Sequence, residues 1–144
     1  MAHPALDPLQ TAERIASGGD ATYVDVRPVA DFVKGHPKGR VINVPVEFYH
    51  PRTGFAHANE SFVLVLQHTL ANDTPVVVGG DADGRTERAA DLMVEAGFTD
   101  VSVMSAGLIG WRTCGLAVTG NNADGVSYVS LLTPAKRAAT PSSS

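Results

Sequence analysis

The segment from Gly80 to Arg85, with the sequence Gly-Asp-Ala-Asp-Gly-Arg, holds the residue types best suited to binding or chemistry. A glycine-rich turn between the end of a buried strand and the start of a helix directs backbone N–H groups toward one point, and the helix dipole favours an anion there. Asp81 and Asp83 oppose that preference, and each would cost a nearby anion roughly 1 to 4 kcal/mol if it pointed inward. The pattern therefore predicts a ligand-binding loop with a weakened attraction for anions.

Other interpretations of these polar residues differ in how well the sequence supports them. The simplest is a tight strand-to-helix turn with solvated aspartates, in which Asp83 caps the following helix. A calcium loop is excluded, because Arg85 stands where an oxygen ligand is needed and Thr86 where the sharp turn requires glycine. Ser105 and Thr86 lack an identifiable histidine base, which argues against serine-hydrolase chemistry.

Cys114 is the only cysteine, so no intrachain disulfide and no cysteine-based metal cluster can form. A helix running back from the last strand would carry Cys114 roughly 10 Å from the ligand edge of the sheet, which predicts a packing or surface role. Five histidines show no paired metal-ligand spacing, and we expect His36 to be a turn or helix-end residue. No metal and no cofactor are expected.

Short β-favouring runs alternate with helical patterns along the chain, which predicts a mostly parallel α/β sheet. Val76 to Val78 is apolar at every position, as in a central strand covered on both faces. Asp7-Pro8 predicts a capped first helix. The expected strands are 23–26, 41–44, 76–78 and 101–104, and the expected helices are 8–16, 28–34, 60–70, 85–96 and 108–112.

The 144 residues and the formal net charge of −4 suit one mildly acidic domain. Nothing in the composition attracts nucleic acid, and no run approaches the roughly 18 apolar residues that cross a bilayer. The single cysteine and the absence of an export signal predict a cytoplasmic protein. We expect a domain over residues 1–119 and an extension over 120–144, with one short ordered element at 126–132 and a flexible tail from Ala138 to Ser144.

Seven fragments in order resemble the rhodanese-like sulfurtransferase family. The Asp-Val-Arg strand end stands at Tyr23 to Arg27, and the strand, active loop and helix stand at Pro75 to Ala90, with Arg85-Thr86 in place of the family's Arg-Ser/Thr. The other fragments are Phe32 with Gly35-His36, Gly39 with Asn43-Val44-Pro45 (one residue longer here), Gly97-Phe98, Ala106-Gly107 with Trp111, and Gly115-Leu116.

The resemblance implies a rhodanese-like three-layer fold in which a mostly parallel central sheet is flanked by helices. The family's catalytic cysteine lies five positions before the loop arginine, which places it at Gly80 in this chain. Sulfur transfer requires a thiolate, so no catalytic residue is predicted in the loop. Asp25, Arg27 and Thr86 are expected to support the loop by hydrogen bonds.

The expected function is therefore a binding or regulatory module for an unidentified protein or small molecule. The competing interpretation is an active sulfurtransferase whose thiol comes from Cys114, from a partner chain or from a shifted loop register. A phosphatase or arsenate reductase would share the architecture, but it also needs a loop cysteine.

Overall fold

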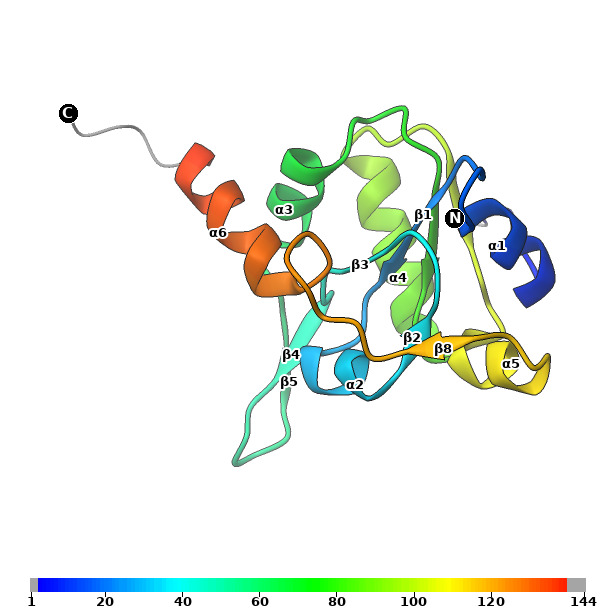
Figure 1. Ribbon diagram of the computed structural model, residues 1–144. Coiled ribbons are helices and arrows are strands. Elements are labelled where there is room, and N and C mark those ends of the chain that lie inside the picture. The colour runs from blue at the N-terminus through cyan, green and yellow to red at the C-terminus, as the bar shows by residue number, and fades with distance from the viewer. Residues whose placement is uncertain (1–2, 140–144) are drawn as a thin grey trace.

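The computed structural model describes residues 3–139 and shows one central sheet with helices on both faces (Figure 1). The sheet has the order β3-β1-β6-β7, and all its neighbouring pairs are parallel. Its strands are β1 (Thr22–Asp25), β3 (Val41–Asn43), β6 (Val76–Gly79) and β7 (Val101–Val103). Val77 faces Tyr23 on one side and Ser102 on the other, so β6 is an interior strand, as its continuous apolar run predicts.

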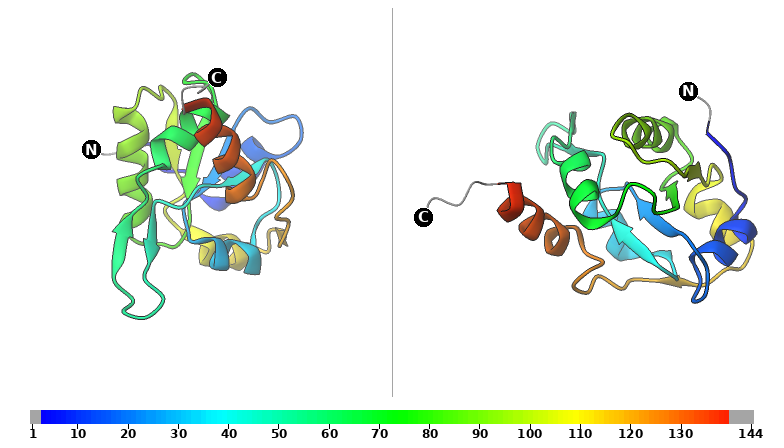
Figure 2. Two further views of the ribbon diagram at one scale, coloured as in Figure 1. Left: turned by 90° about the vertical axis from the view of Figure 1, so that its left-hand side faces the viewer. Right: turned by 90° about the horizontal axis from the view of Figure 1, so that it is seen from above.

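Two helical layers cover the sheet, as Figure 2 shows from two further directions. Helices α3 (Phe62–Thr69), α4 (Gly84–Glu95) and α6 (Tyr128–Ala139) contribute buried side chains to one core with Val24, Val78 and Val103. Helices α1 (Pro8–Ile15), α2 (Val29–Lys34) and α5 (Gly107–Thr113) contribute to a second core with Tyr23, Val77 and Met104. The predicted three-layer fold is confirmed.

The helix ends follow local capping chemistry. Asp7 and Gln10 form a reciprocal capping box at the start of α1, next to Pro8. Asp83 caps α4 by accepting a hydrogen bond from the Arg85 N–H group. The patterns that predicted these helices therefore act through the backbone groups that each helix leaves unpaired at its first turn.

Two small antiparallel pairs were not predicted. A hairpin of β4 (Glu47–Tyr49) and β5 (Ala56–Ala58) occupies a stretch that we expected to be a loop, and it projects from the body in Figure 1. The second pair joins β2 (His36–Pro37) to β8 (Val118–Thr119). His36 follows the Gly35 cap of α2, as expected, but it is also buried in this pair and its ring stacks on Phe32. These elements of two or three residues are too short to leave a periodic signal.

The C-terminal extension adds to the core. The short ordered element predicted at 126–132 is instead the 12-residue helix α6, which packs on α3 and buries Tyr128, Leu131 and Ala135. Ala138 and Ala139 end this helix, whereas the rest of the predicted tail lies outside the described residues. Within residues 3–139, no helix is long and apolar enough to cross a membrane.

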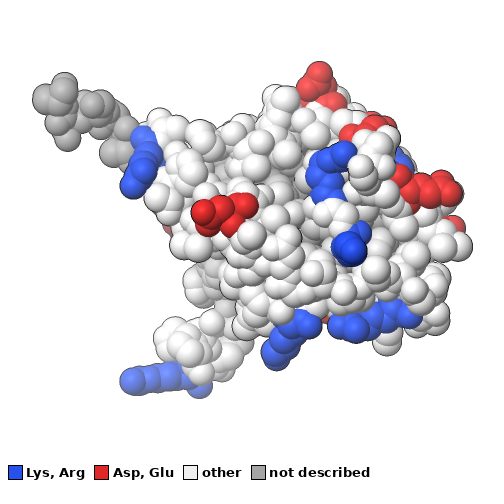
Figure 3. All heavy atoms as spheres, viewed as in Figure 1, with Lys and Arg blue, Asp and Glu red and all other residues white. Residues whose placement is uncertain are grey.

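Charged side chains are spread over the surface. The face in Figure 3 carries several small basic groups, some of them next to acidic groups and the others set apart by uncharged surface. Together with the net charge of −4, this distribution gives the shown face no continuous basic area of the kind that binds nucleic acid.

Candidate ligand-binding loop

The predicted loop leaves the carboxyl edge of the parallel sheet, where open α/β sheets bind ligands. β6 ends at Gly79, and α4 begins at Gly84, so residues 80–83 form the turn. Thr86, in the first turn of α4, donates a hydrogen bond from its hydroxyl to the carbonyl oxygen of Asp81 at 3.2 Å. The loop backbone is therefore fastened to the helix that follows it.

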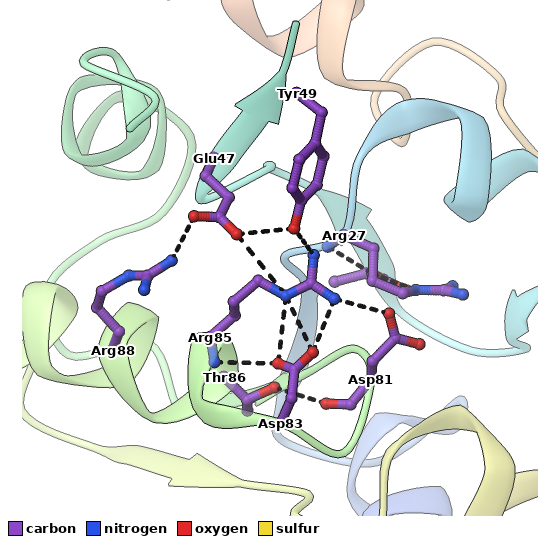
Figure 4. Close-up of polar contacts among 9 residues, drawn as sticks. Arg27, Glu47, Tyr49, Asp81, Asp83, Arg85, Thr86 and Arg88 are labelled. Carbon is purple, nitrogen blue, oxygen red and sulfur yellow. Dashed lines mark hydrogen bonds and ion pairs between the residues drawn. The ribbon is translucent and has the colours of Figure 1, made fainter. Parts of the chain in front are cut away.

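Arg85 occupies the centre of the loop's polar groups. Its Nη2 atom lies 3.0 Å from Asp81 Oδ2 and 2.8 Å from Asp83 Oδ2, and its Nε atom lies 3.0 Å from Asp83 Oδ2. Figure 4 shows both carboxylates turned toward this one guanidinium group. Hydrogen bonding with Arg85 lowers the pKa of the Asp83 carboxyl, and the same contact raises the pKa of Arg85.

The hairpin places two further residues on this cluster, as Figure 4 also shows. Arg85 Nη1 donates to the Tyr49 hydroxyl at 2.6 Å, and that hydroxyl donates to Glu47 Oε1 at 2.9 Å. Arg88, one turn along α4, donates to Glu47 Oε2 at 2.7 Å. Three carboxylates thus face two guanidinium groups, so the cluster has no surplus of positive charge.

Sequence reasoning missed Glu47 and Tyr49. Their positions two residues apart in a strand put both side chains on one face, and that spacing was the available signal. It could not be used without knowing that residues 47–49 form a strand.

A side chain can be accommodated at Gly80. A Cβ atom there would lie 3.1 Å from Arg27 Cγ, 3.5 Å from Val26 Cγ2 and 3.8 Å from Thr86 Oγ1. The first contact is tight and requires the Arg27 methylene group to shift by a few tenths of an ångström. The backbone of Gly80 does not have a positive φ, so this position does not demand glycine.

The start of α5 packs directly against the loop. The Leu108 N–H group donates to the Gly80 carbonyl oxygen at 2.9 Å. Gly107 has a φ of +67°, and a Cβ atom there would lie 2.7 Å from the Ala82 nitrogen. Cys114 is exposed and follows the last residue of this seven-residue helix, so the whole of α5 lies between it and the contact with the loop.

Asp25 and Arg27 form a buried ion pair beside the loop. Arg27 donates to both Asp25 carboxylate oxygens, at 3.0 and 2.8 Å, and to the Gly35 carbonyl oxygen at 2.8 Å. Burial raises the pKa of the Asp25 carboxyl, and the hydrogen bonds from Arg27 oppose that shift. We expected these side chains to hydrogen-bond the loop backbone. In the described structure they hold α2 to β1 instead, and Arg27 touches the loop only by packing under Gly80.

No three acidic, histidine or cysteine side chains within residues 3–139 are grouped in a way that could hold a metal ion. The loop's backbone still offers hydrogen-bond donors, because the N–H groups of Asp81 and Ala82 bond to nothing else among these residues. The arrangement can therefore bind a ligand through backbone amides and through Arg85, provided that the ligand competes with the two aspartates.

Comparison with known proteins places the chain among sulfurtransferase-related domains. A family model described as "Rhodanese-like domain" matches residues 7–114. The senescence-associated protein DIN1 of Raphanus sativus is 30% identical over 108 residues, and thiosulfate sulfurtransferase 16 of Arabidopsis thaliana is 30% identical over 94 residues. These matches cover 75% and 65% of this chain, and 57% and 76% of the respective relatives. The chain thus spans little more than half the length of DIN1.

Solved structures support the same assignment. The crystal structure of the Alr3790 protein from Anabaena sp. superposes with a TM-score of 0.66 at 26% identity, over 81% of this chain and 82% of that one. An NMR structure of the rhodanese-like domain of the same Anabaena protein gives a TM-score of 0.66 at 23% identity, covering 99% of this chain and 88% of that one. The latter likeness concerns the fold alone.

Proposed function

The chain belongs to the rhodanese-like domain family, and we propose that it is a member that binds a ligand or partner without transferring sulfur itself. The observation that carries this proposal is glycine at position 80, at the end of β6 where the loop begins. In the family that this chain resembles, the nucleophile lies five residues before the loop arginine, and Gly80 stands at that position relative to Arg85. Glycine offers no atom that can attack a sulfur donor.

The pairing of Arg85 supports the same proposal. An arginine in this position is suited to holding an anionic donor, but here its guanidinium already contacts Asp81, Asp83 and the Tyr49 hydroxyl. A donor such as thiosulfate would have to displace carboxylates that are covalently part of the same loop. The loop is therefore proposed to have kept the family's backbone shape while losing both its nucleophile and its free cation.

The competing function is sulfur transfer with a thiol supplied by Cys114 or by a partner chain. The position of Cys114 argues against the first version, because seven helical residues at 1.5 Å rise separate it from the loop by about 10 Å. The partner version predicts activity only when a second protein is added. Both remain testable by the same assay.

We would measure thiosulfate:cyanide sulfurtransferase activity in the native protein and in Gly80→Cys. A thiolate takes the outer sulfur of thiosulfate with release of sulfite, and cyanide then removes that sulfur as thiocyanate. The native protein should stay at the uncatalysed background. Gly80→Cys should rise above it by a small margin, since the structure leaves room for a side chain there, and by a larger margin when Asp81→Ser and Asp83→Ser also free Arg85 to hold the donor. Gly84→Cys is the matched control. A Cβ atom at Gly84 would have no neighbour within 4 Å, so the variant should fold, but its thiol would lie at the other end of the loop.

The two alternatives give different results. Native activity that disappears in Cys114→Ser would overturn the proposal and identify Cys114 as the nucleophile. Equal activity in Gly80→Cys and Gly84→Cys would show that Gly80 is not the nucleophile position. A native protein that remains inactive alone but transfers sulfur when a thiol-bearing partner is added would favour the partner version.

The cytoplasm remains the proposed location. It rests on the lone exposed cysteine, which a reducing compartment would keep as a thiol. Fractionation of cells that express the tagged protein at native level would test it. The Arabidopsis thaliana relative described above is named as chloroplastic, so recovery in an organelle would overturn this part of the proposal.

A further inference from the structure

A cavity of about 690 Å³ lies away from the loop, between α1, the segment that enters β3, and the chain that follows α5. Lys38, Gly39 and Arg40 line it immediately before β3, and Ala16 lines it at the end of α1. These segments lead into the parallel strands at their amino ends, whereas the candidate loop leaves from the carboxyl ends. The cavity is therefore a separate feature from the loop, and in Figure 1 the chain that enters β3 is the cyan arch that rises from β2.

The walls of this cavity are largely apolar. Ile15, Val41 and Trp111 are buried side chains that line it, and Leu116 and Val126 line it from the chain after α5. The indole N–H of Trp111 is satisfied by the Ala117 carbonyl oxygen at 2.9 Å, so the indole needs no further polar partner. A volume within 300 to 1,000 Å³, apolar walls and a few polar groups are the usual features of a small-molecule site.

The charged groups of the cavity all have one sign. Lys38 and Arg40 line it, and none of its lining residues is acidic. Among residues 3–139, Lys38 makes no ion pair, and Arg40 uses only its Nη1 atom, on the carbonyl oxygens of Gly19 and Ala21. Asp20, a carboxylate close enough to interact with Arg40, is held by hydrogen bonds from Arg14.

We propose that this cavity is a binding site for a small organic anion with an apolar body and one carboxylate or sulfonate group. The apolar body would lie against Leu116 and Val126, which are partly exposed, above the buried Trp111, where it loses contact with water. The anionic group would lie at the rim beside Lys38 and Arg40, whose charges have no carboxylate partner within the cavity. This inference does not depend on the role of Gly80, so either proposal can fail alone.

The sequence provides an internal reporter for this site. Trp111 is the only tryptophan, and it lines the cavity. A ligand seated there lies close to this buried indole and changes its emission. We would titrate the full chain with 8-anilino-1-naphthalenesulfonate and, in parallel, with N-phenyl-1-naphthylamine, which has the same ring system without the sulfonate.

We expect the sulfonate to bind at one site with quenching of Trp111 and to bind more tightly than its neutral counterpart. Lys38→Gln should weaken sulfonate binding about two- to fivefold, the effect of an exposed ion pair, and should leave the neutral compound unchanged. Lys34→Gln is the matched control, because it removes another exposed lysine that does not line the cavity. Ala16→Phe should weaken both compounds by filling the cavity.

Four results would overturn the inference. If the two compounds bind equally, or if Lys38→Gln and Lys34→Gln behave alike, the cavity does not select anions. If Ala16→Phe keeps the native melting curve and still binds both compounds at native affinity, they bind elsewhere. If the sulfonate leaves the emission of Trp111 unchanged, it does not occupy the cavity, whatever its affinity.

Discussion

The strongest test of the loop's charge balance is to remove the carboxylates that hold Arg85. We would replace Asp81 and Asp83 together by serine. Serine at position 83 keeps an oxygen that can cap α4, so the helix start is preserved while both negative charges are lost. The expected result is tighter binding of sulfate at the loop, because Arg85 loses two of its carboxylate partners and the local repulsion disappears.

The size of the effect follows from the geometry. The two contacts of Arg85 Nη2, at 3.0 Å to Asp81 and 2.8 Å to Asp83, are made by carboxylates whose side chains are 50% and 42% exposed. Ion pairs exposed to this extent contribute about 0.2 to 1 kcal/mol each. The loss of both therefore corresponds to about a two- to thirtyfold gain in sulfate affinity, at 1.4 kcal/mol for each factor of ten.

Binding would be followed by NMR from the amide shifts of Asp81, Ala82 and Gly84 at low ionic strength, where charge effects are least screened. Serine at position 81 leaves its amide available as a probe. Asp73→Ser with Asp124→Ser is the control, because it removes two exposed carboxylates outside the loop and changes the net charge equally. Sulfate affinity that is equal or lower in the loop variant, or equally raised in the control, would refute the reasoning from local charge.

Two further predictions concern stability. Arg27→Met should lower the free energy of unfolding by about 3 to 5 kcal/mol, because the buried Asp25 loses its charge partner and the Gly35 carbonyl oxygen loses its hydrogen-bond donor. Urea denaturation measures this change, and a loss below about 1 kcal/mol would contradict the prediction. Asp83→Asn should change how the free energy of unfolding depends on acidic pH. Hydrogen bonding with Arg85 lowers the pKa of Asp83 in the folded protein. The ionised carboxylate therefore contributes its full stabilisation above the unfolded pKa of about 4, and this contribution is lost as the pH falls through the folded pKa. The melting temperatures of the native protein and Asp83→Asn should therefore converge between about pH 5 and pH 2, and a constant difference would argue against a charged contact at Asp83.

The order of the elements could be predicted from local patterns. The apolar run at Val76–Val78 indicated an interior strand, and the caps at Asp7 and Asp83 marked the starts of α1 and α4. Each signal arises from a requirement of the residue's own neighbourhood: burial on both faces of a parallel sheet, or pairing of the first helical N–H groups. Such requirements are met within a few residues, so they are visible in one sequence.

The direction of long side chains could not be predicted in the same way. The sequence put Arg85 in the same short loop segment as Asp81 and Asp83, but the hairpin residues Glu47 and Tyr49 reach this arginine only because the fold brings β4 over the loop. Arg27 was expected to support the loop, and it binds Asp25 and Gly35 instead. A flexible charged side chain selects among partners that are distant in sequence, and packing decides which of them are within reach.

The sequence by itself determined the family, the layered α/β architecture and the absence of a thiol from the loop, because these depend on residue identity and local periodicity. Only the tertiary structure decided that both the loop and the hairpin hold Arg85, that α6 packs on α3, and that Lys38, Arg40 and Trp111 share a cavity. These features join residues that are far apart in the sequence. Their contacts form when hydrophobic burial brings whole elements together, and no local pattern records that outcome.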